Sequence, residues 1–546
     1  GIPYAEPPAG RLRFKKPSPK RPWSGTFIAN QFGWSCWQTF HPGEWFPVSE
    51  DCLTISVYTP VKNLTSATSD LLPYPVIYYV VGGGWDTATP IKYDYHPLID
   101  NFVTRNVIIT VVNFRLNVFG FWTTGTGEQL GNNGLWDIVA GLKWVQQEIA
   151  SFGGDPNKVT FQGHSGGANI VDLLSVSPKT TGLFHQLVPM SSALVFRQNT
   201  LNSGRELELN RKFSTQVGCN NNSQWENGMY AWVTKCMQMV PAEKLLSEYT
   251  QFNILHELAT SIPRIDSPSG LFPSNFLTLA STRRPYPMMT GSVLREASSF
   301  LGVTLNRTQS TSASAEFACY TGAIAYYPDN PQIIANACRN YYKLTELKNV
   351  HPDSDFEFWW DITIAIGSDY YVFATTFADA ASIRRSAVTN CTNATGRVRE
   401  CPYPVYLYSF EFVRPGFENY APWHAMDLWY LLGHLVVIPP FTITDFSSKS
   451  ITELQLEAKY IDLFCNFAKY SNPTPDFRVH NTPGSHVGNR SSGFVPTFKP
   501  LSTPVGFNYY AFNVESRSKP FYHFHGVNFW TNIVPYLIRQ QRRSNH

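Results

Sequence analysis

The segment Gly163-His164-Ser165-Gly166-Gly167 sets a serine between glycines two residues before it and two residues after it. The β-prone residues 159–162 come directly before this segment, and a helical pattern begins near Gly166. A sharp turn from strand to helix exposes the hydroxyl of such a serine, and the glycines let strand and helix approach closely. We therefore predict that Ser165 is a nucleophile for acyl transfer; the alternative is a small-residue turn without chemistry.

A second glycine run, Gly82-Gly83-Gly84, follows the apolar residues 76–80. Nucleophilic attack on a carbonyl places negative charge on its oxygen, and nearby backbone N–H groups stabilise that charge. Glycines leave these N–H groups unhindered, and a helix N-terminus adds the favourable end of its dipole. Together with Ser165, the run predicts Gly83, Gly84 and Gly166 as oxyanion donors, although alone it fits a flexible turn equally well.

Short apolar runs alternate with helical patterns along the chain, such as the helical spacing of residues 135–149, and no internal repeat is present. This alternation predicts an α/β fold with a large, mostly parallel sheet and helices on both faces. Ligands in such folds bind beyond the carboxyl ends of the strands. We expect residues 1–546 to form one domain. The expected strands are residues 76–80, 107–112, 159–162, 286–290 and 405–412.

The composition supplies a large core and excludes some function classes. Hydrophobic residues make up 43% of the 546 residues, and 43 Lys and Arg against 40 Asp and Glu leave a net charge of only +3. This near-neutral balance gives no broad basic surface for nucleic acid. No apolar run reaches the length of about 18 residues that a transmembrane helix requires. The chain begins at Gly1 without an initiator Met or a signal peptide, so other features must indicate its compartment.

Six Asn-X-Ser/Thr sequons favour a secreted, glycosylated protein, because glycans are added to surface loops along the export route. The sequons begin at Asn63, Asn221, Asn306, Asn390, Asn393 and Asn489.

Nine cysteines agree with export. None forms a Cys-X-X-Cys or Cys/His cluster with zinc-ligand spacing, so disulfides are favoured and no metal site is expected. The odd number leaves at least one unpaired, and Cys465, in an apolar stretch, is the expected buried free thiol. The pairing of Cys319 and Cys338 stays open. Cysteines at short separations are Cys36 with Cys52, Cys219 with Cys236, and Cys391 with Cys401.

Further motifs are spread over nearly the whole chain. They are the opening Gly1-Ile2-Pro3-Tyr4-Ala5-Glu6-Pro7-Pro8 with Leu12-Arg13-Phe14, Ser49-Glu50-Asp51-Cys52-Leu53, Gly131-Asn132-Asn133-Gly134-Leu135-Trp136-Asp137, Phe152-Gly153-Gly154-Asp155-Pro156, Asn466-Phe467-Ala468-Lys469 and Asn472-Pro473. With the nucleophile segment, they resemble the type-B carboxylesterase/cholinesterase family. The resemblance implies an α/β-hydrolase fold. It also implies that the family's first strands precede Gly1, which suggests a truncated N-terminus.

The resemblance supplies the partners of Ser165. The family places its acid in a Gly-X-X-X-X-Glu segment, matched by residues 291–296, which end in Glu296. Its histidine precedes a short segment ending Asp-Leu, matched by His424 and residues 425–428. The order Ser, Glu, His is that of α/β-hydrolases. The same resemblance implies the disulfides Cys36–Cys52 and Cys219–Cys236, and the structural ion pairs Arg13–Glu50 and Arg115–Asp137.

A serine carboxylic-ester hydrolase is the implied function, acting on small or lipophilic esters without cofactor or metal. His424 would take the Ser165 proton, Ser165 would attack the ester carbonyl, and water would later hydrolyse the acyl-enzyme. Glu296 would orient His424 and stabilise its imidazolium. Hydrolysis should then rise with pH as His424 loses its proton.

Three departures from the family pattern keep two alternatives open. His164 stands where an acid is usual, and Val81 where a histidine commonly precedes the glycine run. Pro42 stands where cholinesterases carry the tryptophan that stacks on a quaternary ammonium, and Trp45 is out of register. The alternatives are a catalytically weak or silent adhesion protein and, second, a cholinesterase. The intact set Ser165, Glu296 and His424 favours the esterase.

Overall fold

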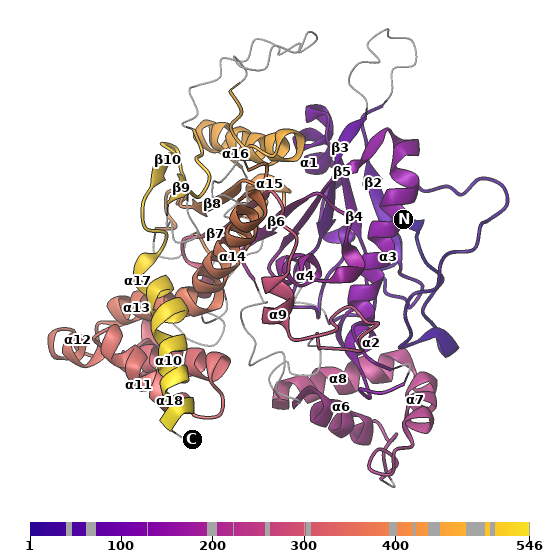
Figure 1. Ribbon diagram of the computed structural model, residues 1–546, viewed down its shortest axis with the longest axis horizontal. Coiled ribbons are helices and arrows are strands. Elements are labelled where there is room, and N and C mark those ends of the chain that lie inside the picture. Colours follow the sequence, from indigo (N-terminus) through magenta and orange to yellow (C-terminus); the bar gives the residue numbers. More distant parts are fainter. Residues whose placement is uncertain are drawn as a thin grey trace.

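A ten-stranded sheet runs through the described part of the chain and takes strands from near both of its ends (Figure 1). The strand order is β1-β2-β4-β3-β5-β6-β7-β8-β9-β10. The computed structural model describes residues 1–39, 46–61, 73–127, 129–193, 205–221, 223–256, 263–299, 301, 307–392, 401–418, 422–434, 448–476, 497–502 and 508–544.

The centre of the sheet is parallel and its two ends are antiparallel. All neighbours from β4 to β9 in the sheet order pair in parallel, whereas β2 pairs antiparallel with β1 and β4, and β9 with β10. A mostly parallel sheet is confirmed. The strands are β1 (Ile2–Pro3), β2 (Thr54–Tyr58), β3 (Tyr74–Val80), β4 (Ile108–Val112), β5 (Gly154–His164), β6 (Gln186–Met190), β7 (Met288–Val293), β8 (Val405–Phe410), β9 (Tyr509–Phe512) and β10 (Arg517–Lys519).

The five expected strands correspond to β3, β4, β5, β7 and β8, with some shifted bounds. Every residue of β3, β4, β7 and β8 is buried, which explains the near-continuous apolar runs of β3, β4 and β8. β7 begins at Met288, not Tyr286. Pro285 and Pro287 flank Tyr286, and proline has no N–H for a strand ladder. β5 begins five residues earlier than expected. The prediction missed these residues because they are mostly polar and include Pro156.

Helices cover both faces of the sheet, as expected. Successive strand side chains point to opposite faces, and the adjacent Tyr78 and Tyr79 of β3 show which helix lies where. The Tyr78 hydroxyl donates to the Ile138 carbonyl of α3 (Asn133–Glu148), whereas the Tyr79 hydroxyl bonds to Tyr93 on the other face. On that face, α16 (Ile451–Tyr470) accepts a hydrogen bond from Gln186 through the Ala468 carbonyl. The nucleophile helix, α4 (Gly166–Ser175), packs on β5, β6 and β3.

A second core lies beside the sheet in what we call the helical cluster, residues 312–373 and 524–544. Figure 1 shows it at the lower left, where it includes the C-terminal helix α18. Buried Trp359, Tyr370 and Trp530 fill its interior. The cluster contains α10 (Ser312–Tyr326), α11 (Pro331–Tyr341), α12 (Leu344–Val350), α13 (Phe356–Ser368), a π-helical turn (Asp369–Phe373), α17 (Phe524–Asn528), a second π-helical turn (Phe529–Ile533) and α18 (Val534–Ser544); α14 (Ala374–Cys391) leads from it back to the sheet.

A third group of helices stands at the lower right of Figure 1. It comprises α6 (Arg205–Gln216), α7 (Tyr230–Met239) and α8 (Ala242–His256), which share a small core with α2 (Asn117–Phe121). The remaining helices are α1 (Tyr95–Asn101), α9 (Phe276–Ser281) and α15 (Asp427–Leu431). Within the described ranges, no helix combines the length and apolar character that crossing a membrane requires.

Four disulfides link cysteines that are near one another in the sequence. Cys36–Cys52 and Cys219–Cys236 have the pairing that the family resemblance implied. Cys391–Cys401 joins two of the short-separation cysteines, and Cys319–Cys338 joins α10 to α11. Cys465 is the buried free thiol; burial raises its pKa to about 12, so this thiol is unreactive at neutral pH.

Candidate active site

Ser165 lies at the carboxyl end of β5 in a strained conformation, with φ 55° and ψ −122°. The glycines around it make this turn sterically feasible. A Cβ at Gly163 would come within 2.5 Å of the Gly167 backbone, and a Cβ at Gly167 would collide with the Val80 carbonyl of β3. Strand and helix therefore meet at van der Waals contact, with Ser165 partly exposed at their junction.

The glycine run after β3 packs directly against this junction. A Cβ at Gly82 would lie 2.5 Å from the His164 carbonyl oxygen and 3.1 Å from the Ser165 Cβ. A Cβ at Gly166 would lie 2.9 Å from the Gly84 amide nitrogen. The two backbones that carry the predicted donors are thus in contact beside the serine. Gly83 has φ 133° and Gly84 φ 64°, conformations that glycine adopts readily.

His424 and Glu296 form a short, buried hydrogen bond. Nδ1 of His424 lies 2.5 Å from the Glu296 Oε2, and the two residues are 8% and 0% exposed. The other carboxylate oxygen, Oε1, accepts the Val293 N–H at 2.9 Å. This bond fixes the glutamate, and the glutamate holds Nδ1, so Nε2 is the ring nitrogen through which His424 could exchange protons with a substrate or nucleophile.

Backbone pairing brings the loops of these two residues together. Glu296 follows β7 by three residues, and His424 follows β8 by fourteen. Arg295 forms a parallel bridge with Trp423, and its N–H donates to the Pro422 carbonyl at 3.0 Å. On the serine side, the ring of His164 lies 4.7 Å from that of His424. The structure therefore gathers the three predicted residues at the carboxyl edge of the sheet.

A second acid, Asp427, lies close to His164 and interacts electrostatically with Glu296 and His424. Asp427 is fully buried, and its Oδ2 accepts the Tyr460 hydroxyl at 3.0 Å. Its Oδ1 faces Nε2 of His164 at 3.9 Å, and neither of these atoms has a hydrogen-bond partner among the described residues. Burial, followed by the charge of Glu296, raises the pKa of Asp427 to about 7. Burial, followed by the charges of His424 and His434, lowers the pKa of His164 well below its usual value, so His164 is neutral at pH 7.

The implied ion pairs lie apart from these groups. Arg13 forms two 2.6 Å hydrogen bonds to Glu50, and Arg115 two side-chain hydrogen bonds of 2.7 Å to Asp137. The first pair joins the N-terminal segment to the loop before Cys52 of a disulfide, and the second joins the loop between β4 and α2 to α3.

Only some of the other predicted positions fall within the described residues. Asn221 and Asn390 are exposed, as a glycan requires. The sequons at Asn63, Asn306, Asn393 and Asn489 lie outside the described residues, and so do Pro42 and Trp45. Across the described stretches, no cluster of three or more His, Cys, Asp or Glu side chains could hold a metal ion.

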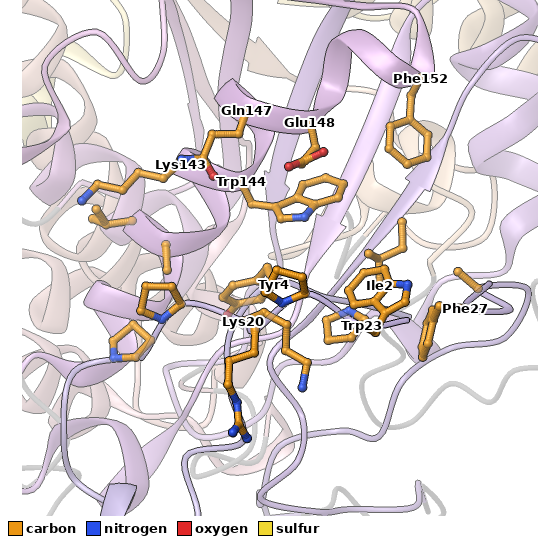
Figure 2. A pocket seen from close by; sticks show the side chains of 18 of the residues that line it. Ile2, Tyr4, Lys20, Trp23, Phe27, Lys143, Trp144, Gln147, Glu148 and Phe152 are labelled. Carbon is orange, nitrogen blue, oxygen red and sulfur yellow. The ribbon is translucent and has the colours of Figure 1, made fainter. Parts of the chain in front are cut away.

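A cavity of about 1030 Å³ lies elsewhere, between α3 and the N-terminal segment. Figure 2 shows Trp144 and Phe152 on one side of it, and Trp23 and Phe27 on the other. Its lining contains none of the residues gathered around Ser165, so the site's chemistry is not located there.

Comparison with known proteins decides the family. The sequence model of the Carboxylesterase family matches residues 1–524. This chain belongs to the carboxylesterase family. Esterase cest-33 of Caenorhabditis elegans is 29% identical over 87% of this chain and 81% of its own length. Carboxylesterase 3B of Mus musculus is 26% identical over 100% of this chain and 87% of its own, and Acetylcholinesterase-1 of Trittame loki is 35% identical over 46% of this chain and 45% of its own.

Membership in the carboxylesterase family confirms the expected fold and the expected class of enzyme, a serine carboxylic-ester hydrolase. Two contributions to the site were not predicted from the sequence. One is the indole of Trp85, whose position directly after a glycine run was an available signal. The other is the contact between His164 and Asp427, which are 263 positions apart and carry no local pattern.

Proposed function

We propose that this carboxylesterase-family chain hydrolyses small or lipophilic carboxylic esters through an acyl-enzyme on Ser165. The 2.5 Å bond between the buried Glu296 and His424, beside the strained turn that presents Ser165, is the observation that carries the proposal. A nucleophile, a base and an orienting acid at one sheet edge are the requirements for this chemistry.

In the proposed mechanism, His424 accepts the Ser165 proton while the serine oxygen attacks the ester carbonyl. The tetrahedral intermediate collapses, and the alcohol leaves with the proton from His424. Water then loses a proton to His424, attacks the acyl-enzyme and releases the carboxylic acid. Glu296 stabilises the imidazolium each time it forms.

The oxyanion formed in both halves is assigned to the N–H groups of Gly83, Gly84 and Gly166. The contact between the Gly84 and Gly166 backbones supports this assignment. Gly166 is also the first residue of α4, where N–H groups have no partner within the helix. Each such donor typically contributes about 2.7–4 kcal/mol to transition-state stabilisation.

Ser165→Ala tests the proposal, with Ser191→Ala as the matched control. Ser191 follows the neighbouring strand β6 and has φ 56°, close to the 55° of Ser165. Turnover of an activated aryl ester should fall by at least about 10⁴-fold in Ser165→Ala and stay unchanged in Ser191→Ala. An organophosphate should add its phosphoryl mass to the wild type and to Ser191→Ala only. Wild-type protein that neither hydrolyses the ester nor takes the label would contradict the proposal.

We further propose that the chain folds as one domain and passes through the secretory pathway. The sheet that joins residues 2–519 supports one domain, and four disulfides with exposed sequons at Asn221 and Asn390 support export. Protein secreted from eukaryotic cells should lose mass after enzymatic deglycosylation, at peptides containing these asparagines. Unmodified asparagine at both positions would contradict this proposal.

A further inference from the structure

The oxyanion loop contains three successive residues with positive φ. Gly83 and Gly84 are followed by Trp85 at φ 68°. Bulky residues rarely adopt this conformation, which costs about 1–2 kcal/mol. A tryptophan here therefore requires contacts that compensate for the strain.

Trp85 is held from three directions. Its Nε1–H donates to the Gly166 carbonyl at 2.9 Å, and its own carbonyl accepts the Asn117 N–H of α2 at 2.8 Å. Its ring stacks on Phe121 of α2, with centroids 5.7 Å apart and an interplanar angle of 25°. Phe121 is 1% exposed, so the indole packs against a fixed surface.

The residue after Trp85 anchors the same loop to α8. The Tyr249 hydroxyl donates to the Asp86 Oδ1 at 2.6 Å, and the Asp86 N–H donates to the Gly83 carbonyl at 3.1 Å. Both flanks of Trp85 are therefore fixed, and the loop does not depend on the indole hydrogen bond to remain folded. What the indole adds is a direct bond from the loop to the nucleophile helix.

We propose that Trp85 is a positioning residue that fixes the spacing of the two oxyanion donors, Gly84 and Gly166. Gly84 precedes Trp85 directly, and the Trp85 indole bonds Gly166, so one rigid side chain links both donor residues. The Cδ1 of Trp85 also lies 3.3 Å from where a Gly166 Cβ would be, which places the ring edge against this glycine. The inference rests on the proposed function, because donor spacing matters only if an oxyanion forms there.

Loss of the indole hydrogen bond should slow the chemical step rather than weaken substrate binding. Oxyanion donors act mainly on the transition state, and small misplacements of catalytic groups reduce rates strongly. We expect kcat to fall about tenfold, less than the 10²–10³-fold typical of deleting a donor, while KM changes little.

Trp85→Phe removes the N–H and keeps an aromatic ring for Phe121. The matched control is Trp359→Phe in the helical cluster, where a buried indole donates to the Pro352 carbonyl at 3.1 Å. Measurements are kcat and KM for an aryl ester, the Tm, and the affinity of an aryl trifluoromethyl ketone, which forms an oxyanion adduct with a serine. Trp85→Phe should lose kcat and ketone affinity by similar factors, whereas Trp359→Phe should lose only Tm.

Unchanged kcat in folded Trp85→Phe, or equal losses of kcat in both variants, would overturn the inference. If Ser165→Ala abolishes the wild-type turnover, the proposed function stands even when the inference about Trp85 fails. Failure of the inference can therefore be distinguished from failure of the proposed function. Should Trp85→Phe fail to fold, Phe121→Leu loosens the ring support and keeps the indole N–H. It should reduce kcat by a smaller factor with KM unchanged, and no reduction would equally count against the inference.

Discussion

Two regions of the molecule bury a carboxylic acid against a tyrosine hydroxyl, yet only one of them is equipped for chemistry. Near Ser165, Asp427 accepts from Tyr460 at 3.0 Å; in the helical cluster, Asp369 accepts from Tyr342 at 2.7 Å. Burial raises the pKa of each acid to about 7. A perturbed carboxyl group is therefore not by itself a sign of a catalytic site.

The difference lies in the neighbours. Asp427 faces His164, and the charges of Glu296 and His424 shift its pKa. Asp369 instead packs against Gly526 of α17 and accepts a hydrogen bond from Tyr342. Backbone strain does not distinguish the two regions: Ser165 and Ala425 have positive φ near the first acid, and Lys343, which follows Tyr342, has φ 55° near the second. Convergent titratable groups at one sheet edge distinguish the site from a buried acid that only packs.

The largest expected effect compares two His–acid pairs. His424 bonds the buried Glu296 at 2.5 Å, whereas His351 bonds Asp355 at 2.9 Å in the partly exposed loop between α12 and α13. His424→Asn should reduce kcat for an aryl ester by about 10⁴-fold or more, because the base is lost. His351→Asn should leave kcat unchanged and lower the free energy of unfolding by about 1 kcal/mol at most.

Steady-state kinetics and urea unfolding of the two histidine variants measure this contrast. Comparable activity in both would mean that the geometry around His424 does not confer catalysis.

A smaller effect compares the two buried acids through the pH dependence of stability. Each acid has a folded-state pKa of about 7, raised from 3.8. The folded state thus retains a proton that the unfolded state releases between these values, and stability from this group falls as pH rises from about 4 to 7. Asp427→Asn and Asp369→Asn remove the titrating group and with it this fall in stability. The free energy of unfolding of each variant, relative to wild type, should therefore increase as pH rises from about 4 to 7 and stay constant above about pH 7.

Activity separates the same two variants. Asp427 carries its negative charge mainly above its folded-state pKa of about 7, where that charge stabilises the imidazolium formed in the transition state. Asp427→Asn should therefore lower kcat/KM above about pH 7 and change it little at lower pH, whereas Asp369→Asn should leave the whole profile in place. Differential unfolding at several pH values and one pH–rate series measure both effects, and an unchanged kcat/KM above about pH 7 in Asp427→Asn would show that Asp427 is not coupled to the base.

Much of the sheet could be predicted because its signals are local. Continuous apolar runs identified β3, β4 and β8 to within two residues, since strands buried on both faces need apolar side chains throughout. The start of β5 could not be predicted, because residues 155–157 (Asp, Pro and Asn) carry no apolar strand pattern, and the pairing with β3 is irregular there, passing from Gly154 to Val159. The helical cluster was not predicted at all, since its helices are defined by packing among distant segments.

The sequence by itself determined the nucleophile turn and the glycine loop. Steric conflict with the nearby Gly167 backbone is enough to require glycine at Gly163, and that requirement is readable in one dimension, whereas Gly167 is required by the Val80 carbonyl of β3. Only the tertiary structure decided that Glu296 holds His424 across 128 positions, that Trp85 bonds Gly166 across 81, and that His164 meets Asp427. These contacts arise where strand ends converge at one edge of a sheet, and strand order is set by packing of the whole chain rather than by any local pattern.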